Sequence, residues 1–322
     1  MPLLEVKDLK TYFYSIHGVV KAVDGISFHV DRGESFGLAG ESGSGKTTTA
    51  LSIMRLIKPP GRILSGEILF DGENLLEKTV NEIDDIRWKR ISMIFQGAMN
   101  ALNPVYRIGD QIGEAIIHHE GATKEEAIER SMELLKTVGI DPSRVNNYPH
   151  EFSGGMKQRA MIAMALALSP DLVIADEPTT ALDVIIQRQI INLMNSLRND
   201  LNISLILITH DLSVISELCE RTGIFYAGKL LEVASTKTLL ESPLHPYTLG
   251  LIRAFPSIDG ERRRLKAIGG APPSLIEPPS GCRFHPRCPR ASPKCANEEP
   301  ELIEVEKGHY VACHLICPQE GR

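Results

Sequence analysis

The stretch from Gly40 to Thr47 carries the residue types that a phosphate group needs. It reads Gly-Glu-Ser-Gly-Ser-Gly-Lys-Thr and matches G-x-x-x-x-G-K-[ST] at every fixed position. Its glycines permit backbone angles that turn successive N–H groups toward phosphate oxygens. Lys46 would place its charge on the β- and γ-phosphates, and the Thr47 hydroxyl would bind Mg²⁺. The predicted nucleotide contacts are Gly40, Glu41, Ser42, Gly43, Ser44, Gly45, Lys46, Thr47 and Thr48.

The segments on either side of this loop favour the same function. The residues from Ser35 to Ala39 predict a short buried strand, and those from Thr47 to Leu56 predict a helix whose N-terminal dipole attracts anions. A glycine-rich turn that merely precedes Lys-Thr is the alternative. Because a phosphate loop requires a strand before it and a helix after it, the context favours an α/β core that binds ATP and Mg²⁺.

Two adjacent carboxylates follow another apolar stretch. The residues from Leu172 to Ala175 predict a strand of a parallel sheet, and ligands bind at the carboxyl ends of such strands. Asp176 would bind Mg²⁺, and Glu177 would polarise the water that attacks the γ-phosphate. Such a pair is on its own typical of a solvated loop. Together with the phosphate loop, it predicts a hydrolytic site.

Four other polar positions are ambiguous when each is taken singly. Ser153-Gly154-Gly155 opens a predicted helix, where it suits either an anion site or an ordinary N-cap. Gln96 is typical of a surface residue, Asp183 of an N-cap and His210 of a solvated histidine. Their order along the chain is more informative than any one of them.

That order resembles the family of ABC-type ATPases. Phe152-Ser153-Gly154-Gly155-Met156 resembles the family's signature sequence, and Gln96, Ala181-Leu182-Asp183 and His210 match its Q-loop, D-loop and switch histidine. Two departures stand out, since many members have L-S-G-G-Q in the signature and serine where Thr180 stands here. Neither departure removes a catalytic group. The resemblance therefore implies a hydrolysing subunit.

The resemblance also implies how the parts work together. Two ATPase domains would face each other head to tail, and each ATP would lie between the phosphate loop of one and the signature of the other. His210 would contact the γ-phosphate. Gln96 would bind Mg²⁺, sense the γ-phosphate and link the γ-phosphate to the membrane subunits. Phe13, or Tyr12 as second choice, would stack on adenine. The implied catalytic residues are Lys46, Gln96, Glu177 and His210, and the implied nucleotide contacts add Phe13, Ser153, Gly154, Gly155 and Asp183.

Further segments resemble the ATPases of peptide and nickel importers, and most closely the dipeptide-transport ATPase subunit. They are Phe95-Gln96, residues 99–104, residues 176–186, residues 242–248 and residues 278–282. The resemblance implies a second ATPase subunit (or a second copy), two integral membrane permeases and, indirectly, an extracytoplasmic binding protein. It places the chain peripherally on the cytoplasmic face of the cell membrane. We expect the chain to power import of di- or oligopeptides, with nickel or another small solute as the alternative cargo.

The pattern of elements divides the chain into three parts. Residues 1–96 and 169–240 are expected to form a P-loop ABC-ATPase core, residues 97–168 an inserted helical subdomain, and residues 241–322 a Cys- and Pro-rich C-terminal extension dominated by loops. The expected strands cover residues 3–13, 22–30, 66–70, 91–95, 172–175 and 204–209. The expected helices cover residues 108–119, 124–138, 156–168 and 184–199.

Composition excludes several other classes of protein. A net charge of −6 and a pI near 6.0 disfavour binding to nucleic acid, and no apolar run is long enough to cross a membrane. A soluble ABC ATPase of DNA repair would carry long coiled-coil insertions, and one of translation would carry two sets of nucleotide motifs. This chain has neither feature. The presence of Glu177 and His210 disfavours a regulatory protein that binds nucleotide without hydrolysing it.

Cysteines crowd the extension. Disulfides are disfavoured in the cytoplasm and unpaired thiols in a loop would be reactive, so metal binding is favoured. Zinc sites usually contain C-x₂₋₄-C pairs, which are absent, although His285, His309 and His314 could supply nitrogens. Four irregularly spaced thiolates also suit an iron–sulfur cluster. We expect a structural [4Fe–4S] cluster, with Zn²⁺ as the alternative and Cys317 as the spare thiol, on the ligands Cys282, Cys288, Cys295 and Cys313.

Overall fold

The computed structural model describes residues 1–97, 101–254 and 268–316 of the chain. Met99 and Asn100 of the importer-like segment, and the spare Cys317, lie outside the described residues. The described residues form two compact units. Unit 1 contains Met1, residues 31–34 and residues 77–207, and unit 2 contains residues 2–30, residues 35–76 and the residues from Ile208 onward. Within the described ranges no helix is both long and apolar enough to span a membrane.

Unit 2 contains an antiparallel sheet in the order β2-β1-β4-β5. Leu4 of β1 pairs with Val30 of β2 on one side and with Phe70 of β4 on the other. The Thr11 hydroxyl of β1 lies 2.8 Å from the Ser52 hydroxyl of α1, and both are fully buried. The elements are β1 (Leu4–Ser15), β2 (Gly18–Val30), α1 (Lys46–Ile53), β4 (Gly61–Phe70) and β5 (Glu73–Asn74).

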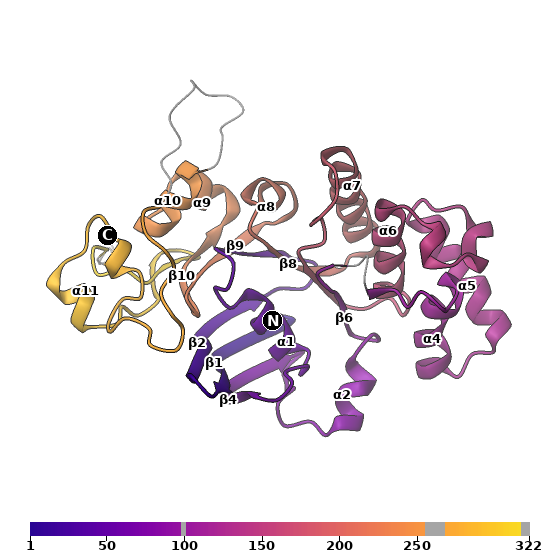
Figure 1. Ribbon diagram of the computed structural model, residues 1–322, viewed down its shortest axis with the longest axis horizontal. Helices are drawn as coiled ribbons and strands as arrows, with labels where there is room; N and C mark the ends of the chain where they lie inside the picture. Colours follow the sequence, from indigo (N-terminus) through magenta and orange to yellow (C-terminus); the bar gives the residue numbers. More distant parts are fainter. Residues whose placement is uncertain (98–100, 255–267, 317–322) are drawn as a thin grey trace. The chain divides into compact units, whose positions relative to one another are not determined.

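A second group of strands in unit 2 has the order β11-β12-β10-β9-β3 (Figure 1). β3 runs parallel to β9, and the remaining neighbours are antiparallel. The C-terminal extension therefore contributes strands to this sheet. These elements are β3 (Ser35–Ala39), α8 (Leu212–Leu218), β9 (Arg221–Tyr226), β10 (Lys229–Ser235), α9 (Thr236–Glu241), α10 (Pro246–Ala254), η3 (His285–Arg287), α11 (Pro293–Asn297), β11 (Ile303–Glu306) and β12 (His309–Val311).

Unit 1 combines a small set of strands with helices. β6 runs parallel to β7, and β8 is the other neighbour of β7. Helices α4, α5 and α6 pack against one another (Figure 1). Thr123 and Glu126 form a capping box that begins α5, and Gly121, with φ 69°, ends α4. The elements are α2 (Val80–Ile86), β6 (Ile91–Ile94), α4 (Ile108–Glu120), α5 (Lys124–Thr137), η1 (Pro142–Asn146), η2 (Pro149–Glu151), α6 (Gly154–Ala165), β7 (Leu172–Asp176), α7 (Val184–Leu201) and β8 (Ser204–Thr209), whose last two residues belong to unit 2.

The expected strands and helices are present, with shifts at their ends. The helix expected over residues 156–168 covers Gly154–Ala165, because Ser153 caps it two residues earlier. The extension, expected to be dominated by loops, also contains short helices and strands. Pro246 and Pro293 lie in the first turns of α10 and α11, where a missing N–H costs nothing. β9 and β10 were not expected.

Candidate active site

The glycines of the phosphate loop hold backbone angles that other residues rarely adopt. Gly40, Gly43 and Gly45 have φ angles of 150°, 74° and 113°. A Cβ on Gly40 would lie 2.2 Å from the Phe225 carbonyl oxygen, and one on Gly45 would lie 2.3 Å from the Ala22 carbonyl oxygen. Both approaches are too close for a side chain. The loop therefore keeps this shape only with glycine at Gly40 and Gly45, whereas a Cβ on Gly43 would meet no other atom within 4 Å.

Lys46 lies across this loop. It is 5% exposed and begins α1. Its Nζ donates to the carbonyl oxygens of Gly40 at 2.8 Å and Glu41 at 2.9 Å, and to Ser44 Oγ at 3.3 Å. The ammonium group is thus held among the loop's own oxygens, the position from which it can meet phosphate. Thr47 follows on the exposed side of the same helix turn.

The acidic pair lies at the end of β7 in unit 1. Asp176 is 1% exposed, and Glu177 has φ 46°, a conformation that a glutamate holds only when its surroundings enforce it. One oxygen of the Glu177 carboxylate accepts from Gln96 Nε2 at 2.9 Å and from Thr180 Oγ1 at 2.9 Å. The structure therefore brings Gln96 and Glu177 together and gives the unusual Thr180 a contact.

The signature and D-loop residues cap neighbouring helices of unit 1. Ser153 Oγ accepts from the Met156 N–H at 3.3 Å, and an Asp183 carboxylate oxygen accepts from the Ile186 N–H at 2.9 Å. A Cβ on Gly155 would lie 2.7 Å from a side-chain carbon of Ile186. Gly155 therefore permits close packing of α6 against α7. These contacts explain the local structure, and a role toward nucleotide stays a prediction.

His210 and the candidate aromatic residues lie in unit 2. His210 is exposed and directly follows β8. Phe13 is half-buried, and a Cβ on Gly61 would lie 2.6 Å from its ring. The Tyr12 hydroxyl donates to Asp24, and burial together with this bond raises the pKa of Tyr12 far above its usual value. Contact of Phe13 or Tyr12 with adenine stays a prediction.

Comparison with known proteins gives the family. The family pattern described as ABC transporter matches residues 23–180, and the pattern described as Oligopeptide/dipeptide transporter, C-terminal region, matches residues 231–295. The chain is 48% identical over 322 residues to the oligopeptide transport ATP-binding protein AppD of Bacillus subtilis, covering 99% of this chain and 98% of that protein. The chain belongs to the oligopeptide/dipeptide family of ABC transporter ATP-binding proteins.

Other relatives agree with this membership. The dipeptide transport ATP-binding protein DppD of Escherichia coli is 44% identical, with 100% of this chain and 99% of that protein covered. The solved dimeric structure of MJ0796, a bacterial ABC transporter cassette, superposes with a TM-score of 0.65 at 27% identity over 72% of this chain and 98% of that chain. This family member is therefore an ABC ATPase coupled to peptide transport, with the α/β cassette fold and a C-terminal extension.

The extension of this family member is tied to the rest of unit 2 through a buried carboxylate. Glu232 of β10 has no exposed surface and accepts from the main-chain N–H groups of Leu244 at 2.7 Å and His245 at 3.1 Å. Its other contact is with His309 Nε2 of β12, at 2.8 Å. Burial lowers the pKa of His245 to about 3, so its neutral ring accepts from the Tyr247 N–H through Nδ1.

Two residues that the sequence analysis did not single out contact the phosphate loop. Arg287 binds the Glu41 carboxylate through two nitrogens, and the Tyr247 hydroxyl accepts from the Glu41 N–H. Tyr247 belongs to the segment of residues 242–248 that resembles peptide and nickel importers, and Arg287 precedes Cys288. No signal in the sequence connects either position with Glu41.

The four expected cysteine ligands lie in one electrostatic neighbourhood. Burial and the other three thiols raise the pKa of Cys282 to about 11. Burial also raises the pKa of Cys288 and of Cys313, with further contributions from neighbouring thiols that include Cys295. All four thiols are free. Among the described residues, however, no group of three or more His, Cys, Asp or Glu side chains is arranged to hold a metal ion.

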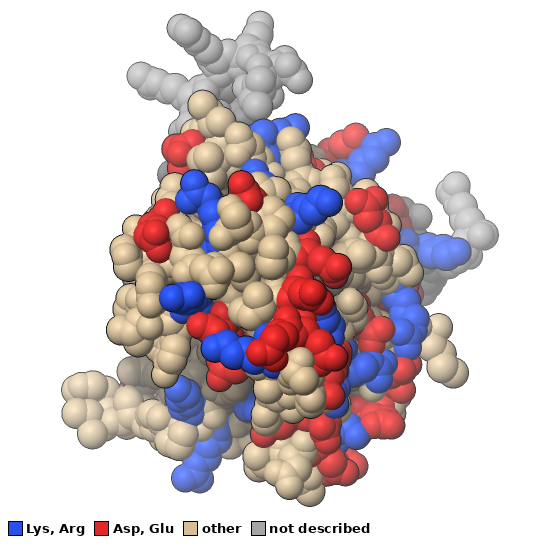
Figure 2. Space-filling model, turned by 90° about the vertical axis from the view of Figure 1, so that its right-hand side faces the viewer, with Lys and Arg blue, Asp and Glu red and all other residues tan. Residues whose placement is uncertain are grey.

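A groove of about 1040 Å³ runs along α4 in unit 1. Its wall includes Tyr106, 57% exposed, and Ile117, 41% exposed, beside charged residues such as Asp110 and Lys124, whose side chains pair at 3.2 Å. Figure 2 looks at the side of the molecule where α4 and α5 lie, and it shows a band of acidic side chains with uncharged surface next to it. Apolar side chains exposed in a groove are typical of a docking surface.

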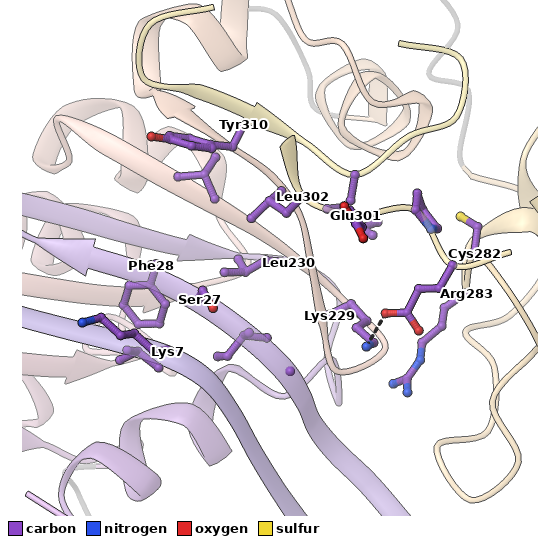
Figure 3. A pocket seen from close by; sticks show the side chains of 18 of the residues that line it. Lys7, Ser27, Phe28, Lys229, Leu230, Cys282, Arg283, Glu301, Leu302 and Tyr310 are labelled. Carbon is purple, nitrogen blue, oxygen red and sulfur yellow. Dashed lines mark ion pairs between the residues drawn. The ribbon is translucent and has the colours of Figure 1, made fainter. Parts of the chain in front are cut away.

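A second cavity, of about 700 Å³, lies beneath the extension in unit 2. Phe28 and Lys7 line one side, and Lys229, Arg283 and Cys282 line the other (Figure 3). Lys229 is paired with Glu299 and Asp24, and Arg283 with Asp24. No phosphate-loop residue lines this cavity, so it is separate from the candidate nucleotide site.

Proposed function

We propose that this chain is the ATP-hydrolysing subunit that powers import of dipeptides and oligopeptides. The observation that carries the proposal is the phosphate loop, whose glycines are required by backbone geometry and whose Lys46 is held inside it. Identity along the full length to transport proteins for oligopeptides and dipeptides supports peptide over nickel or another small solute as cargo. The chain is expected to work peripherally at the cytoplasmic face of the membrane.

Each proposed site residue then has a separate task. The phosphate loop and Lys46 bind the phosphates, while Thr47, Gln96 and Asp176 hold Mg²⁺. Glu177 polarises the attacking water, and the hydrogen bond from Gln96 Nε2 at 2.9 Å orients its carboxylate before reaction. His210 contacts the γ-phosphate. Because the transition state for phosphoryl transfer needs alignment and charge stabilisation, such positioning is the main catalytic contribution of the protein.

We propose that the working form is a head-to-tail dimer with a second ATPase subunit or a second copy. Ser153, Gly154 and Gly155 would complete the nucleotide site of the partner, and Asp183 would support it. The dimeric form of the similar cassette supports this arrangement. The isolated chain is expected to hydrolyse ATP slowly and to gain turnover when the partner and permeases are added. Full activity of the isolated chain across a wide dilution series would contradict the dimer.

We also propose that the groove along α4 receives a cytoplasmic helix of the permease. Most of its wall belongs to residues 97–168, the proposed helical subdomain, and Asp84, Arg87 and Trp88 complete it. The groove exposes apolar side chains beside charged ones. The core would cover residues 1–96 and 169–240, and the extension residues 241–322. Co-purification with two integral membrane permeases tests the assignment to a transporter. Cross-links that place permease contacts mainly on the extension would contradict this docking site.

Finally, we propose a [4Fe–4S] cluster on Cys282, Cys288, Cys295 and Cys313. Neighbouring thiols of these four cysteines raise the pKa of Cys282, Cys288 and Cys313, which supports a thiolate-rich group, and four thiolates are the usual ligands of such a cluster. When bound, the cluster would stabilise the extension because ligand binding is linked to folding. Anaerobically purified protein should be brown and contain iron and sulfide. Colourless protein, with one zinc or no metal, would contradict the cluster and leave the ATPase proposal intact.

A further inference from the structure

The phosphate loop is contacted by a distant part of the chain. Arg287 donates from Nη1 to Glu41 Oε2 at 2.7 Å and from Nη2 to Glu41 Oε1 at 3.0 Å. The side chain of Arg287 is only 6% exposed and that of Glu41 26%, so water screens this ion pair weakly. Two parallel hydrogen bonds between guanidinium and carboxylate fix orientation as well as distance. Glu41 is therefore held at the entrance of the loop by a residue of the extension.

The Arg287 side chain is itself fixed from several sides. Its Nε donates to the Gly269 carbonyl oxygen at 2.8 Å, and its guanidinium carbon lies 5.6 Å from the centre of the Tyr226 ring. The bond to Glu41 holds the pKa of Arg287 above its usual range. The guanidinium group is thus oriented in advance, and it loses little conformational freedom on binding Glu41.

Tyr247 holds the main chain of the same residue. Its hydroxyl accepts from the Glu41 N–H at 3.1 Å, and its ring has no exposed surface. Ring centres of Tyr226 and Phe284 lie 4.6 Å and 5.3 Å away. Phe284 belongs to the segment between Cys282 and Cys288, as does Arg287. One short segment of the extension therefore supports both contacts to Glu41.

Glu41 in turn contacts the lysine that would bind phosphate. Its carbonyl oxygen accepts from Lys46 Nζ at 2.9 Å, next to the contact with the Gly40 carbonyl oxygen at 2.8 Å. A shift of Glu41 would therefore move an oxygen that positions the Lys46 ammonium group. The contacts run without a gap from Arg287 and Tyr247 through Glu41 to Lys46.

We propose that Arg287 and Tyr247 are positioning residues that hold the phosphate loop in the conformation that binds ATP. The C-terminal extension then contributes directly to nucleotide affinity, in addition to its own folding. This inference rests on the proposed role of Lys46 in binding phosphate. In this proposal each residue acts through its contact with Glu41.

The test measures the ATP dissociation constant of the full chain by calorimetry, with the thermal midpoint recorded without nucleotide. We expect Arg287→Ala to weaken ATP binding about tenfold, within the usual range for coupling between sites. Arg287→Lys keeps the charge but loses the paired hydrogen bonds, so its ATP affinity should lie between those of the wild-type chain and Arg287→Ala. Lys294→Ala is the matched control, because it removes an exposed cation of the extension that pairs with Glu298 at 3.6 Å.

A double variant separates positioning from general destabilisation. If Arg287 acts through Glu41, Glu41→Gln combined with Arg287→Ala should bind ATP no more weakly than Arg287→Ala alone. If Arg287→Ala does not fold, Tyr247→Phe removes a single oxygen, and it should weaken ATP binding roughly threefold. The inference would be overturned if Arg287→Ala bound ATP with wild-type affinity while Lys46→Ala did not. Where Arg287→Ala does not fold, the same result for Tyr247→Phe would overturn it. Wild-type affinity in Lys46→Ala would overturn the proposed function instead.

Discussion

In the phosphate loop the informative contacts join near neighbours in sequence, whereas in the C-terminal extension they span most of the chain. Lys46 contacts Gly40, six positions earlier, but Arg287 contacts Glu41 across 246 positions. Residue types at fixed spacing can encode the first kind of contact. The second kind exists only after β9, β10 and the extension have folded together. A nucleotide motif is therefore recognisable from its sequence even though part of its support is not.

The largest effect that we predict concerns chemistry at the end of β7. Glu177→Gln should lower ATP hydrolysis in the assembled transporter about 10³-fold while ATP binding stays near wild type, because only polarisation of water is lost. Phosphate release and nucleotide binding measure the two effects. Glu133→Gln, an exposed change on α5, is the matched control. Hydrolysis at the wild-type rate would remove Glu177 from the mechanism.

Lys46→Ala removes the contact between near neighbours in the phosphate loop. Loss of the ammonium group from the loop should weaken ATP binding roughly 100-fold, since charge on the β- and γ-phosphates is then unmatched. The loss should exceed that of Arg287→Ala, because Lys46 would contact the nucleotide and Arg287 would not. Calorimetry on both variants in one buffer gives the ratio. If Arg287→Ala lost as much ATP affinity as Lys46→Ala, or more, the extension would contribute at least as much to nucleotide binding as the phosphate loop.

The thiols of the extension predict a pH dependence. In metal-free protein the pKa of Cys282 is raised from near 9 to about 11, so its alkylation by iodoacetamide at pH 8 should be about 100-fold slower than for an ordinary cysteine. Between pH 9 and pH 11 the Cys282 thiol stays protonated in the folded state but has lost its proton in the unfolded state. The free energy of unfolding should therefore fall as pH rises from 9 to 11. Fast alkylation of Cys282 at pH 8 would contradict this.

The smallest effect is expected at the groove along α4. Ile117→Glu should reduce stimulation of ATP hydrolysis by the permeases about threefold, because a charge replaces an apolar contact at a partly exposed position. ATP binding by the free chain should not change. Leu201→Glu, at an exposed apolar residue on α7, is the control. Equal loss in both variants would mean that the groove has no special role.

Most of the fold could be predicted because its elements have local signals. The strand before the phosphate loop, the capping box at Thr123 and the apolar stretch before Asp176 each depend on residues close in sequence. β11 and β12 could not be predicted in the same way, since both are short and depend on pairing, β12 with β10 and β11 with β12.

In the candidate site, too, the residues with local sequence signals could be predicted and those that depend on distant partners could not. Residue types and order indicated Lys46, Asp176, Glu177 and His210, and the hydrogen bond between Gln96 and Glu177 connects two of the motifs. The role of Glu41 could not be predicted, because its side chain occupies a variable position of the pattern and its partner is Arg287. A side chain whose partner lies far along the chain carries no periodic or spacing signal.

Uptake of a radiolabelled dipeptide into vesicles measures whether ATP hydrolysis at Glu177 drives peptide transport. The vesicles would contain the assembled transporter with either the wild-type chain or Glu177→Gln, and ATP would be supplied on the side of the ATPase subunits. We expect ATP-dependent uptake with the wild-type chain and near-complete loss with Glu177→Gln, although both chains bind ATP. Equal uptake by both, or transport of nickel with no transport of peptide, would contradict it.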